Sequence, residues 1–287
     1  MDLCGFPDCG HDVPDRATGC PHCGRPGLFP NVRAASRPDE IAALDQRYAD
    51  ARRDVNARGC STVADAFMQQ VEGSKAVIAR PLGEVERLAR NDHEVYSTYY
   101  KQIEAEIRLP DSLPWDPMRR IAEEALFPGY KDDIRFASLT LDDRGLASYG
   151  DCFFTLRPSM MAHRTSVFEE NNVLFMKSRD LPFSKLVDLP RGHRATWVDR
   201  AKFCLAKLGH SLQPSTPVTD FPALLQHAGK TTSDDDFVEV HVWGPITIHA
   251  IEKVLLTRPE KGRAAQAKRR AWGEKLQKQY GVTLEAP

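Results

Sequence analysis

The sequence predicts an α+β protein with a small N-terminal Cys4 zinc ribbon, a helical connector and one larger mixed α/β domain. Four cysteines with metal-ligand spacing lie in the first 23 residues. Beyond them, helical patterns come in groups between short strand patterns, without βαβ alternation. The chain has 287 residues of which 41% are hydrophobic, enough for one main core plus small appendages. We expect the ribbon over residues 1–30, the connector over 31–73 and the main domain over 74–287.

The ribbon is predicted from the pattern C-x4-C…C-x2-C, formed by Cys4, Cys9, Cys20 and Cys23, with a glycine after each pair. Four thiolates complete the tetrahedral shell of a structural Zn²⁺. About 30 residues rarely bury enough apolar surface to fold alone, so the metal would supply the folding energy. Disulfides and unligated thiols are the alternatives. The three remaining cysteines are isolated, which fits buried thiols in a reducing cytoplasm.

Composition restricts the class of partner. The chain has 39 basic and 40 acidic residues, so attraction to nucleic acid requires a local patch. The N-terminal residues lack the pattern of a secretory signal, and no run reaches the roughly 18–20 apolar residues of a membrane span. We therefore expect a cytoplasmic protein with no membrane partner.

Two helices are predicted before the main domain. Residues 38–58 begin with Pro and two acidic residues, as first turns do, and carry a narrow apolar stripe. A second helix is expected over residues 61–72, ending at Gly73. The pair is either a connector or oligomerising arm, or an N-terminal extension packed on the main domain.

In the main domain, the patterns alternate between short strands and grouped helices. Strands are expected over residues 75–80, 134–141, 151–156, 173–176 and 236–242. Helices are expected over residues 82–90, 96–109, 118–126, 195–208, 221–227 and 259–280. Residues 246–256 fit a strand or a helix.

The predicted strand at residues 236–242 places a carboxylate among rings. Alternate residues of a strand share a face, so Val238, Val240 and Val242 point one way. Glu239 and His241 then point the other way, together with Phe237 and Trp243. A carboxylate buried in such surroundings needs partners and is often functional. The alternative is an exposed edge strand with ordinary polar residues.

A second polar segment runs over residues 145–172. Tyr149 stands at the mouth of a predicted strand, and Thr165 and Ser166 follow in a stretch that ends in two asparagines. These hydroxyls and amides offer hydrogen bonds to a sugar or phosphate. The alternative is a turn rich in local side-chain caps.

The order of these segments resembles the ADP-ribosyltransferase superfamily, especially its bacterial toxin-type and nucleic-acid-modifying branches. A strand ending in Arg80 leads into a helix, Tyr149-Gly-Asp enters a strand, and Arg-Thr-Ser precedes Asn-Asn. A late strand then reads Phe-Val-Glu239-Val-His-Val-Trp-Gly-Pro-Ile. The resemblance covers about residues 74–256 and excludes the ribbon.

The resemblance implies an enzyme that uses NAD⁺, with Glu239 as its catalytic glutamate. Thr165 and Ser166 match the hydroxyl segment of a middle strand that supports that glutamate or the nicotinamide ribose. Arg80, with Arg135 as its rival, matches the early-strand residue that binds the NAD⁺ phosphates. Tyr149 would stack on nicotinamide, and His241 would contribute to the cofactor site.

The resemblance leaves the acceptor open. Position 237 is Phe, where many protein-modifying members carry Glu or Gln, so arginine-directed protein modification is disfavoured. Residues 258–278 hold eight basic residues against two Glu, which predicts either a phosphate-tracking surface or a solvated terminal helix. The expected role is a toxin or phage-defence effector that modifies nucleic acid or protein, with an antitoxin as a conceivable partner.

Two other functions fit the same residues. A metal-dependent nuclease would gather a divalent cation with Asp235, Glu239 and His241, although Asp235 and Glu239 lie about 13 Å apart along an uninterrupted strand. A non-enzymatic adaptor would bind nucleic acid through the zinc ribbon and the basic C-terminal helix.

Overall fold

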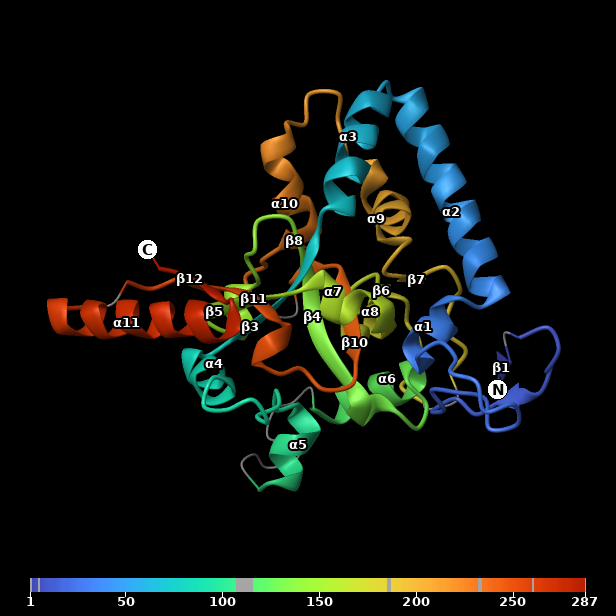
Figure 1. Ribbon diagram of the computed structural model, residues 1–287. Coiled ribbons are helices and arrows are strands. Elements are labelled where there is room, and N and C mark those ends of the chain that lie inside the picture. The colour runs from blue at the N-terminus through green and yellow to red at the C-terminus, as the bar shows by residue number, and fades with distance from the viewer. Residues whose placement is uncertain are drawn as a thin grey trace.

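The computed structural model describes residues 2–4, 6–106, 116–184, 187–231, 234–259 and 261–286, and it is centred on an eight-stranded sheet (Figure 1). The sheet runs in the order β12 (Thr283–Glu285), β11 (Ile251–Leu256), β5 (Cys152–Leu156), β3 (Lys75–Arg80), β4 (Ile134–Thr140), β10 (Glu239–Trp243), β6 (Thr165–Phe168) and β7 (Arg194–Thr196). Neighbours are antiparallel except β11 and β12. The mainly antiparallel sheet agrees with the expected α+β class.

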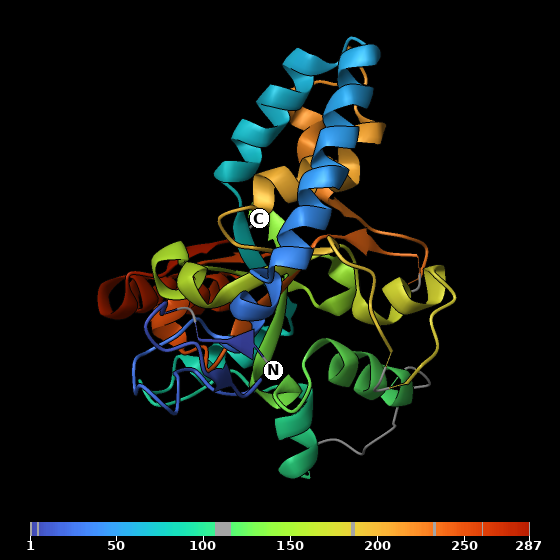
Figure 2. The same cartoon turned by 90° about the vertical axis from the view of Figure 1, so that its right-hand side faces the viewer.

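One face of the sheet supports the largest apolar core. The helices α3 (Ser61–Glu72), α9 (Arg200–Leu208) and α10 (Phe221–Leu225) contribute Phe67, Phe203 and Phe221, all fully buried. The helix α2 (Pro38–Ala57) packs along α9, and both views show these helices grouped on one side (Figures 1 and 2). The α2–α3 pair therefore shares its core with the sheet. This agrees with the interpretation of the two helices as an N-terminal extension packed on the main domain.

The opposite face is covered by α6 (Asp116–Leu126) and α8 (Asn172–Ser178), which contribute Leu126 and Phe175 to a second apolar cluster around Phe168 of β6. The strand expected over residues 173–176 is thus wrong, because this segment lies within α8. The side chain of Asn171 accepts hydrogen bonds from the N–H groups of Val173 and Leu174. An asparagine in this N-cap position starts a helix, which overrides the apolar strand-like pattern.

A split opens in the middle of the sheet, between β3 and β4. These two strands pair over residues 75–77 and no further, although both are described in full. Beyond Val77, β3 continues to pair with β5 as far as Arg80, while β4 pairs with β10 from Ile134 to Ser138. The two halves of the sheet therefore diverge, and side chains from both strands face the gap.

The remaining helices flank the sheet. α4 (Leu82–Leu88) and α5 (Tyr99–Glu104) follow β3, and α11 (Arg263–Tyr280) projects at the far edge beside β12 (Figure 1). The last residues of the helix expected over 96–109 lie outside the described chain. The other short elements are β1 (Asp2–Leu3), β2 (Asp12–Val13), α1 (Pro30–Ala35), α7 (Pro158–Met161), β8 (Gln226–His227) and β9 (Asp236–Phe237).

Two segments begin or end differently from expectation. Residues 194–196 form the edge strand β7, so α9 starts only at Arg200. The ambiguous segment 246–256 contains the strand β11, which buries Ile251, Val254 and Leu256, with a break in the alternation at the register shift between Ile251 and Lys253. Within the described residues, no helix has the length and apolar character required to cross a membrane.

Candidate functional site

A cavity of about 540 Å³ occupies the split in the sheet. Its walls come from β3, β4, the start of β10, α5, α6 and the turn before β5. The volume lies within the roughly 300–1,000 Å³ typical of small-molecule sites. Charged and polar side chains line it beside aromatic rings, so the cavity suits a ligand with both polar and ring-bearing parts.

Glu239 enters this cavity from the first position of β10, and only 4% of it is exposed. Its Oε2 lies 2.9 Å from Nε2 of His241, two residues further along the same strand. In the tautomer with its hydrogen on Nε2, the imidazole donates to the carboxylate. The imidazole itself packs among the rings of Phe127, Phe136 and Phe168. The surroundings therefore hold the carboxylate in one orientation.

The strand expected over residues 236–242 is divided, because β9 pairs with β8 in a separate two-stranded sheet and β10 begins at Glu239. The valines at 238, 240 and 242 still point to the other face, as the alternation predicts. Val238, Val240 and Val242 are completely buried in the large core. Glu239 is paired on both sides, with Ser138 of β4 and with Phe168 of β6. It therefore stands in the interior of the sheet, and the edge-strand alternative does not apply.

The hydroxyl beside Glu239 in the cavity belongs to Ser138, whereas Ser166 is paired with His241 on the other side of β10. Directly paired residues of antiparallel strands project on the same face, so Ser138 lies next to the carboxylate in the cavity wall. The hydroxyl of Thr165 instead donates to the Met161 carbonyl. Ser166 accepts a hydrogen bond from Asn31, and neither residue lines the cavity.

Two arginines stand on either side of the split. Arg80 ends β3, and its guanidinium lies 5.5 Å from the centre of the Tyr96 ring. Arg135 lies on β4, is 7% exposed, and has its pKa lowered by burial. Both line the cavity, so the two residues weighed for phosphate binding stand on opposite walls of one space.

Tyr149 lies in the turn before β5 and lines the same cavity. Burial, together with the negative charges of Glu239 and Asp235, raises its pKa to about 12. The next residue, Gly150, has φ +155°, and a Cβ there would lie 2.4 Å from the backbone of Arg80. Glycine is required at this position, because any side chain would collide with β3 and push the Tyr149 turn away from it.

A second carboxylate, Glu123, was not identified from the sequence. It is 3% exposed and lines the cavity from α6. Burial raises its pKa to about 7, and the Glu239 charge acts in the same direction, whereas Arg119 and the Tyr100 hydroxyl oppose the rise. In the sequence, the only sign of a polar helical face here is the spacing of Asp116, Arg119 and Glu123 by three and four residues. Polar residues at this spacing usually face solvent, so the pattern does not predict a buried site.

Several polar atoms of the cavity walls are buried with no hydrogen-bond partner among the described residues. Native proteins pair the large majority of such atoms with protein or water. Their gathering around one space indicates that a polar ligand or ordered water completes them. These atoms are Tyr96 Oη, Tyr100 Oη, Glu123 Oε2, Arg135 Nε and Asn172 Oδ1.

The ligand set of the nuclease alternative is not assembled. Asp235 accepts hydrogen bonds from the Ser148 hydroxyl at 2.8 Å and from the Gly229 N–H at 2.9 Å. Its carboxylate thus anchors the turn beside Tyr149. Over the described part of the chain, the one group of His, Cys, Asp and Glu arranged to hold a metal ion is the N-terminal cysteine cluster.

That cluster has the dimensions of a tetrahedral sulfur site. The four sulfurs lie within 4.8 Å of one another, with Cys4 and Cys23 at 3.8 Å and Cys9 and Cys20 at 3.6 Å. Four sulfurs at about 2.3 Å from a tetrahedral Zn²⁺ are separated by about 3.8 Å. The glycines after the pairs have φ of +59° and +70°, the left-handed turns that bring amides around thiolates. The site can hold a metal ion such as Zn²⁺.

The cysteine-bearing segment is fixed to the main domain through α1. Arg33 donates to the carbonyls of Pro14, Asp15 and Ala17. Asn31 of the same helix donates to the backbone carbonyl of His241 at 2.9 Å. One short helix therefore joins the ribbon to the strand that carries Glu239.

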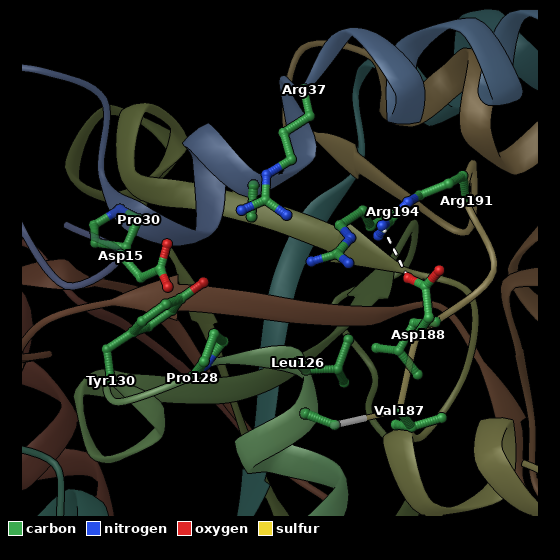
Figure 3. A pocket seen from close by; sticks show the side chains of 13 residues that line it. Asp15, Pro30, Arg37, Leu126, Pro128, Tyr130, Val187, Asp188, Arg191 and Arg194 are labelled. Carbon is green, nitrogen blue, oxygen red and sulfur yellow. Dashed lines mark hydrogen bonds and ion pairs between the residues drawn. The ribbon is translucent and has the colours of Figure 1, made fainter. Parts of the chain in front are cut away.

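A smaller pocket of about 170 Å³ lies at this junction, where Arg37 and Arg194 point toward Tyr130 (Figure 3). Arg191 is paired with Asp188 at 2.9 Å, and Arg194 with Glu40 at 2.8 Å. The second of these ion pairs joins β7 to α2. We take the larger cavity as the candidate site, because it holds Glu239 and the buried polar atoms named above.

Comparison with known proteins adds no identification: no protein-family model matches the chain, and neither does any curated protein. The function must therefore be argued from the site itself.

Proposed function

We propose that this protein is an ADP-ribosyltransferase that cleaves NAD⁺ in the cavity of the split sheet, with Glu239 as its catalytic carboxylate. One observation carries the proposal: the early strand β3, the middle strand β4 and the late strand β10 are neighbours. Arg80, Ser138 and Glu239 from these strands line one cavity. Arg80 and Glu239 are residues that the resemblance names, and in this proposal Ser138 of β4 takes the role that the resemblance gave to Thr165 and Ser166 of β6.

The walls fit the parts of a dinucleotide. A guanidinium binds two phosphate oxygens at once, and Arg80 and Arg135 offer this on opposite sides of the split. Tyr149 and Phe237 present rings to the cavity, with centroids 6.1 Å apart, and rings of this kind stack on heteroaromatic groups. The unpartnered hydroxyl and amide oxygens of Tyr96 and Asn172 suit ribose or carboxamide groups.

The reaction depends on a carboxylate held where positive charge develops. Glu239 accepts a hydrogen bond from a hydroxyl of the nicotinamide ribose and stabilises the oxocarbenium-like transition state. The bond between the ribose and nicotinamide breaks, and its electron pair leaves with nicotinamide. The donor from His241 keeps the carboxylate in position.

Nucleic acid is the acceptor class that the surface favours. On α11, five basic side chains are exposed, and α11 stands at the same side of the molecule as β11 and β12 (Figure 1). A basic surface of this kind tracks phosphates in a salt-dependent manner. The cysteine-bearing segment is a structural zinc ribbon in this account and takes no part in the reaction. The exposed basic residues are Arg263, Lys268, Arg270, Lys275 and Lys278.

The proposal is tested with NAD⁺ labelled in its adenylate phosphate, incubated with the protein and a bacterial lysate. Wild-type protein is expected to release nicotinamide and to label one fraction, nucleic acid or protein. Glu239→Gln is expected to do neither. Glu252→Gln is the matched control, because Glu252 lies on β11 and pairs with Lys75 at the surface. Equal labelling by wild type and Glu239→Gln would exclude the proposed role of Glu239.

A binding adaptor is the second candidate, and the exposed basic side chains of α11 favour it. Under this alternative, removing the basic residues of α11 abolishes nucleic-acid binding while Glu239→Gln has no effect. Binding that does not weaken with salt would argue against nucleic acid as the partner.

A further inference from the structure

The cavity contains two buried carboxylates in different surroundings. Glu239 is hydrogen-bonded to His241. Glu123 forms an ion pair with Arg119, with 3.6 Å between its Oε1 and Nε of the arginine, and the Tyr100 hydroxyl favours its charged form. Two carboxyl groups in such different surroundings are suited to different roles in acid–base chemistry.

We propose that Glu123 is the general base that takes the proton from the acceptor during ADP-ribosyl transfer, an inference that rests on the proposed function. The acceptor is therefore a nucleophile that carries a proton, a hydroxyl or a nitrogen–hydrogen group. A carboxylate acceptor is excluded, because it has no proton to lose and would be repelled by two buried negative charges.

The step balances with the groups already named. The bond from the nicotinamide nitrogen to the ribose C1 breaks, and nicotinamide departs with the electron pair. The acceptor oxygen or nitrogen forms a new bond to the same carbon. Its proton moves to the Glu123 carboxylate and is then released to solvent. No oxidation or reduction takes place, and no further reactant is needed.

The position of Glu123 supports this assignment over Glu239. Glu239 already accepts a hydrogen bond and, in the proposed function, a second one from the ribose. Glu123 projects from α6, while Glu239 projects from β10, so the two carboxylates enter the cavity from different elements. They lie close enough for the charge of Glu239 to raise the pKa of Glu123. The reacting carbon fits between a carboxylate that stabilises charge and one that accepts a proton.

The charged groups around Glu123 determine the pH range over which it can accept a proton. Arg119 on the same helix, Lys131 and the Tyr100 hydroxyl of α5 favour the charged form, whereas Glu239 disfavours it. Burial is the largest influence, and the resulting pKa is about 7. A base with a pKa near neutrality is half available at pH 7 and still strong enough to remove a proton.

The experiment compares Glu123→Gln with Glu124→Gln across pH 5.5 to 8.5. Glu124→Gln is the same substitution at the next residue. The Glu124 side chain does not line the cavity and accepts a hydrogen bond from the Gly129 N–H at 3.0 Å. Label incorporation from NAD⁺ into the lysate and nicotinamide release without lysate are measured separately. Wild type and Glu124→Gln are expected to gain incorporation as pH rises toward about 7 and then level off.

Glu123→Gln is expected to lose incorporation by about 10²-fold or more and to lose this pH dependence, as removal of a general base does. It is expected to keep nicotinamide release to water at a measurable rate. Glu123→Asp, which retains a carboxyl group, should recover the pH dependence at a lower rate. This recovery separates a proton-transfer role from a structural one.

The outcomes distinguish the two proposals. Incorporation by Glu123→Gln at the rate and pH profile of Glu124→Gln would overturn the role of Glu123 and leave the proposed function intact. Equal loss of incorporation and release, without recovery in Glu123→Asp, would also overturn it. Wild-type protein that releases no nicotinamide and labels nothing would overturn the proposed function, and the role of Glu123 with it.

Discussion

The imidazole Nε2 of His241 lies 2.9 Å from the Glu239 carboxylate, although the two residues are separated by one position on the same strand. The strand alternation places both side chains on the same face, and the sheet buries the pair with side-chain exposures of 3% and 5%. Burying a carboxylate without partners is costly, and this hydrogen bond offsets part of the cost of placing Glu239 in the cavity wall.

Replacing His241 with Phe is expected to lower kcat for nicotinamide release by about 10²-fold, because the carboxylate loses the donor that orients it. Phenylalanine fills the space among the neighbouring rings, so the fold should persist. The KM for NAD⁺ should change little, since His241 contacts Glu239 and does not line the cavity. His249→Phe is the control, at an exposed position. An unchanged kcat in His241→Phe would contradict this account.

Ser138→Ala and Ser166→Ala separate the observed site from the one expected from the sequence. Ser138→Ala is expected to reduce nicotinamide release by about tenfold, or about 1.4 kcal/mol, because it removes the hydroxyl of the residue paired with Glu239 in the cavity wall. Ser166→Ala removes an acceptor from Asn31 and should affect stability alone, by about 1 kcal/mol. Kinetic and urea-unfolding measurements on both variants decide the matter. A larger kinetic effect of Ser166→Ala than of Ser138→Ala would favour the role that the resemblance implies for Ser166.

Glu123→Gln should stabilise the protein at alkaline pH. The folded state holds the Glu123 proton up to a pKa of about 7, above the ordinary 4.5, so it binds more protons than the unfolded chain within this window. Stability therefore falls as pH rises from 4.5 to 7. Each pH unit is worth about 1.4 kcal/mol, so the cost above pH 7 is about 3 kcal/mol.

Urea unfolding at pH 8 and at pH 5 measures this cost. Relative to wild type, Glu123→Gln is expected to gain stability at pH 8, and the gain should shrink toward pH 5. Glu124→Gln should show no such gain. A difference between Glu123→Gln and wild type that is the same at both pH values would show that the carboxyl is not buried as described.

One zinc ion per chain is expected in the purified protein, because four sulfurs at tetrahedral spacing form a closed structural site. Chelation should unfold the cysteine-bearing segment and lower the melting temperature. Nicotinamide release should persist after chelation, since none of the four cysteines lines the cavity. Metal analysis and rate measurements before and after chelation test both statements. Loss of activity together with zinc would assign the metal a role beyond structure.

Sequence patterns predicted the elements whose signals are local. The strand β3 at Lys75–Arg80 was expected with the same bounds, and the alternation in β10 predicted the faces of Glu239 and the valines. The cysteine spacing predicted the metal-ligand cluster. In each case neighbouring residues alone determine the result, through strand periodicity or ligand spacing.

The split sheet and the full site could not be predicted in this way. The split depends on where β3 stops pairing with β4, which is a relationship between segments about 60 residues apart. Ser138 becomes the neighbour of Glu239 only through the register of β4 and β10. Glu123 stands among polar residues of α6, a pattern that ordinarily marks a solvent-facing helix.

The most direct test of the central claim is nicotinamide release from NAD⁺ by purified wild-type protein, Glu239→Gln and Glu252→Gln at pH 7.5. The account predicts release by wild type and Glu252→Gln, and a loss of about 10²-fold or more in Glu239→Gln. Release at the same rate by all three proteins, or by none of them, would contradict it.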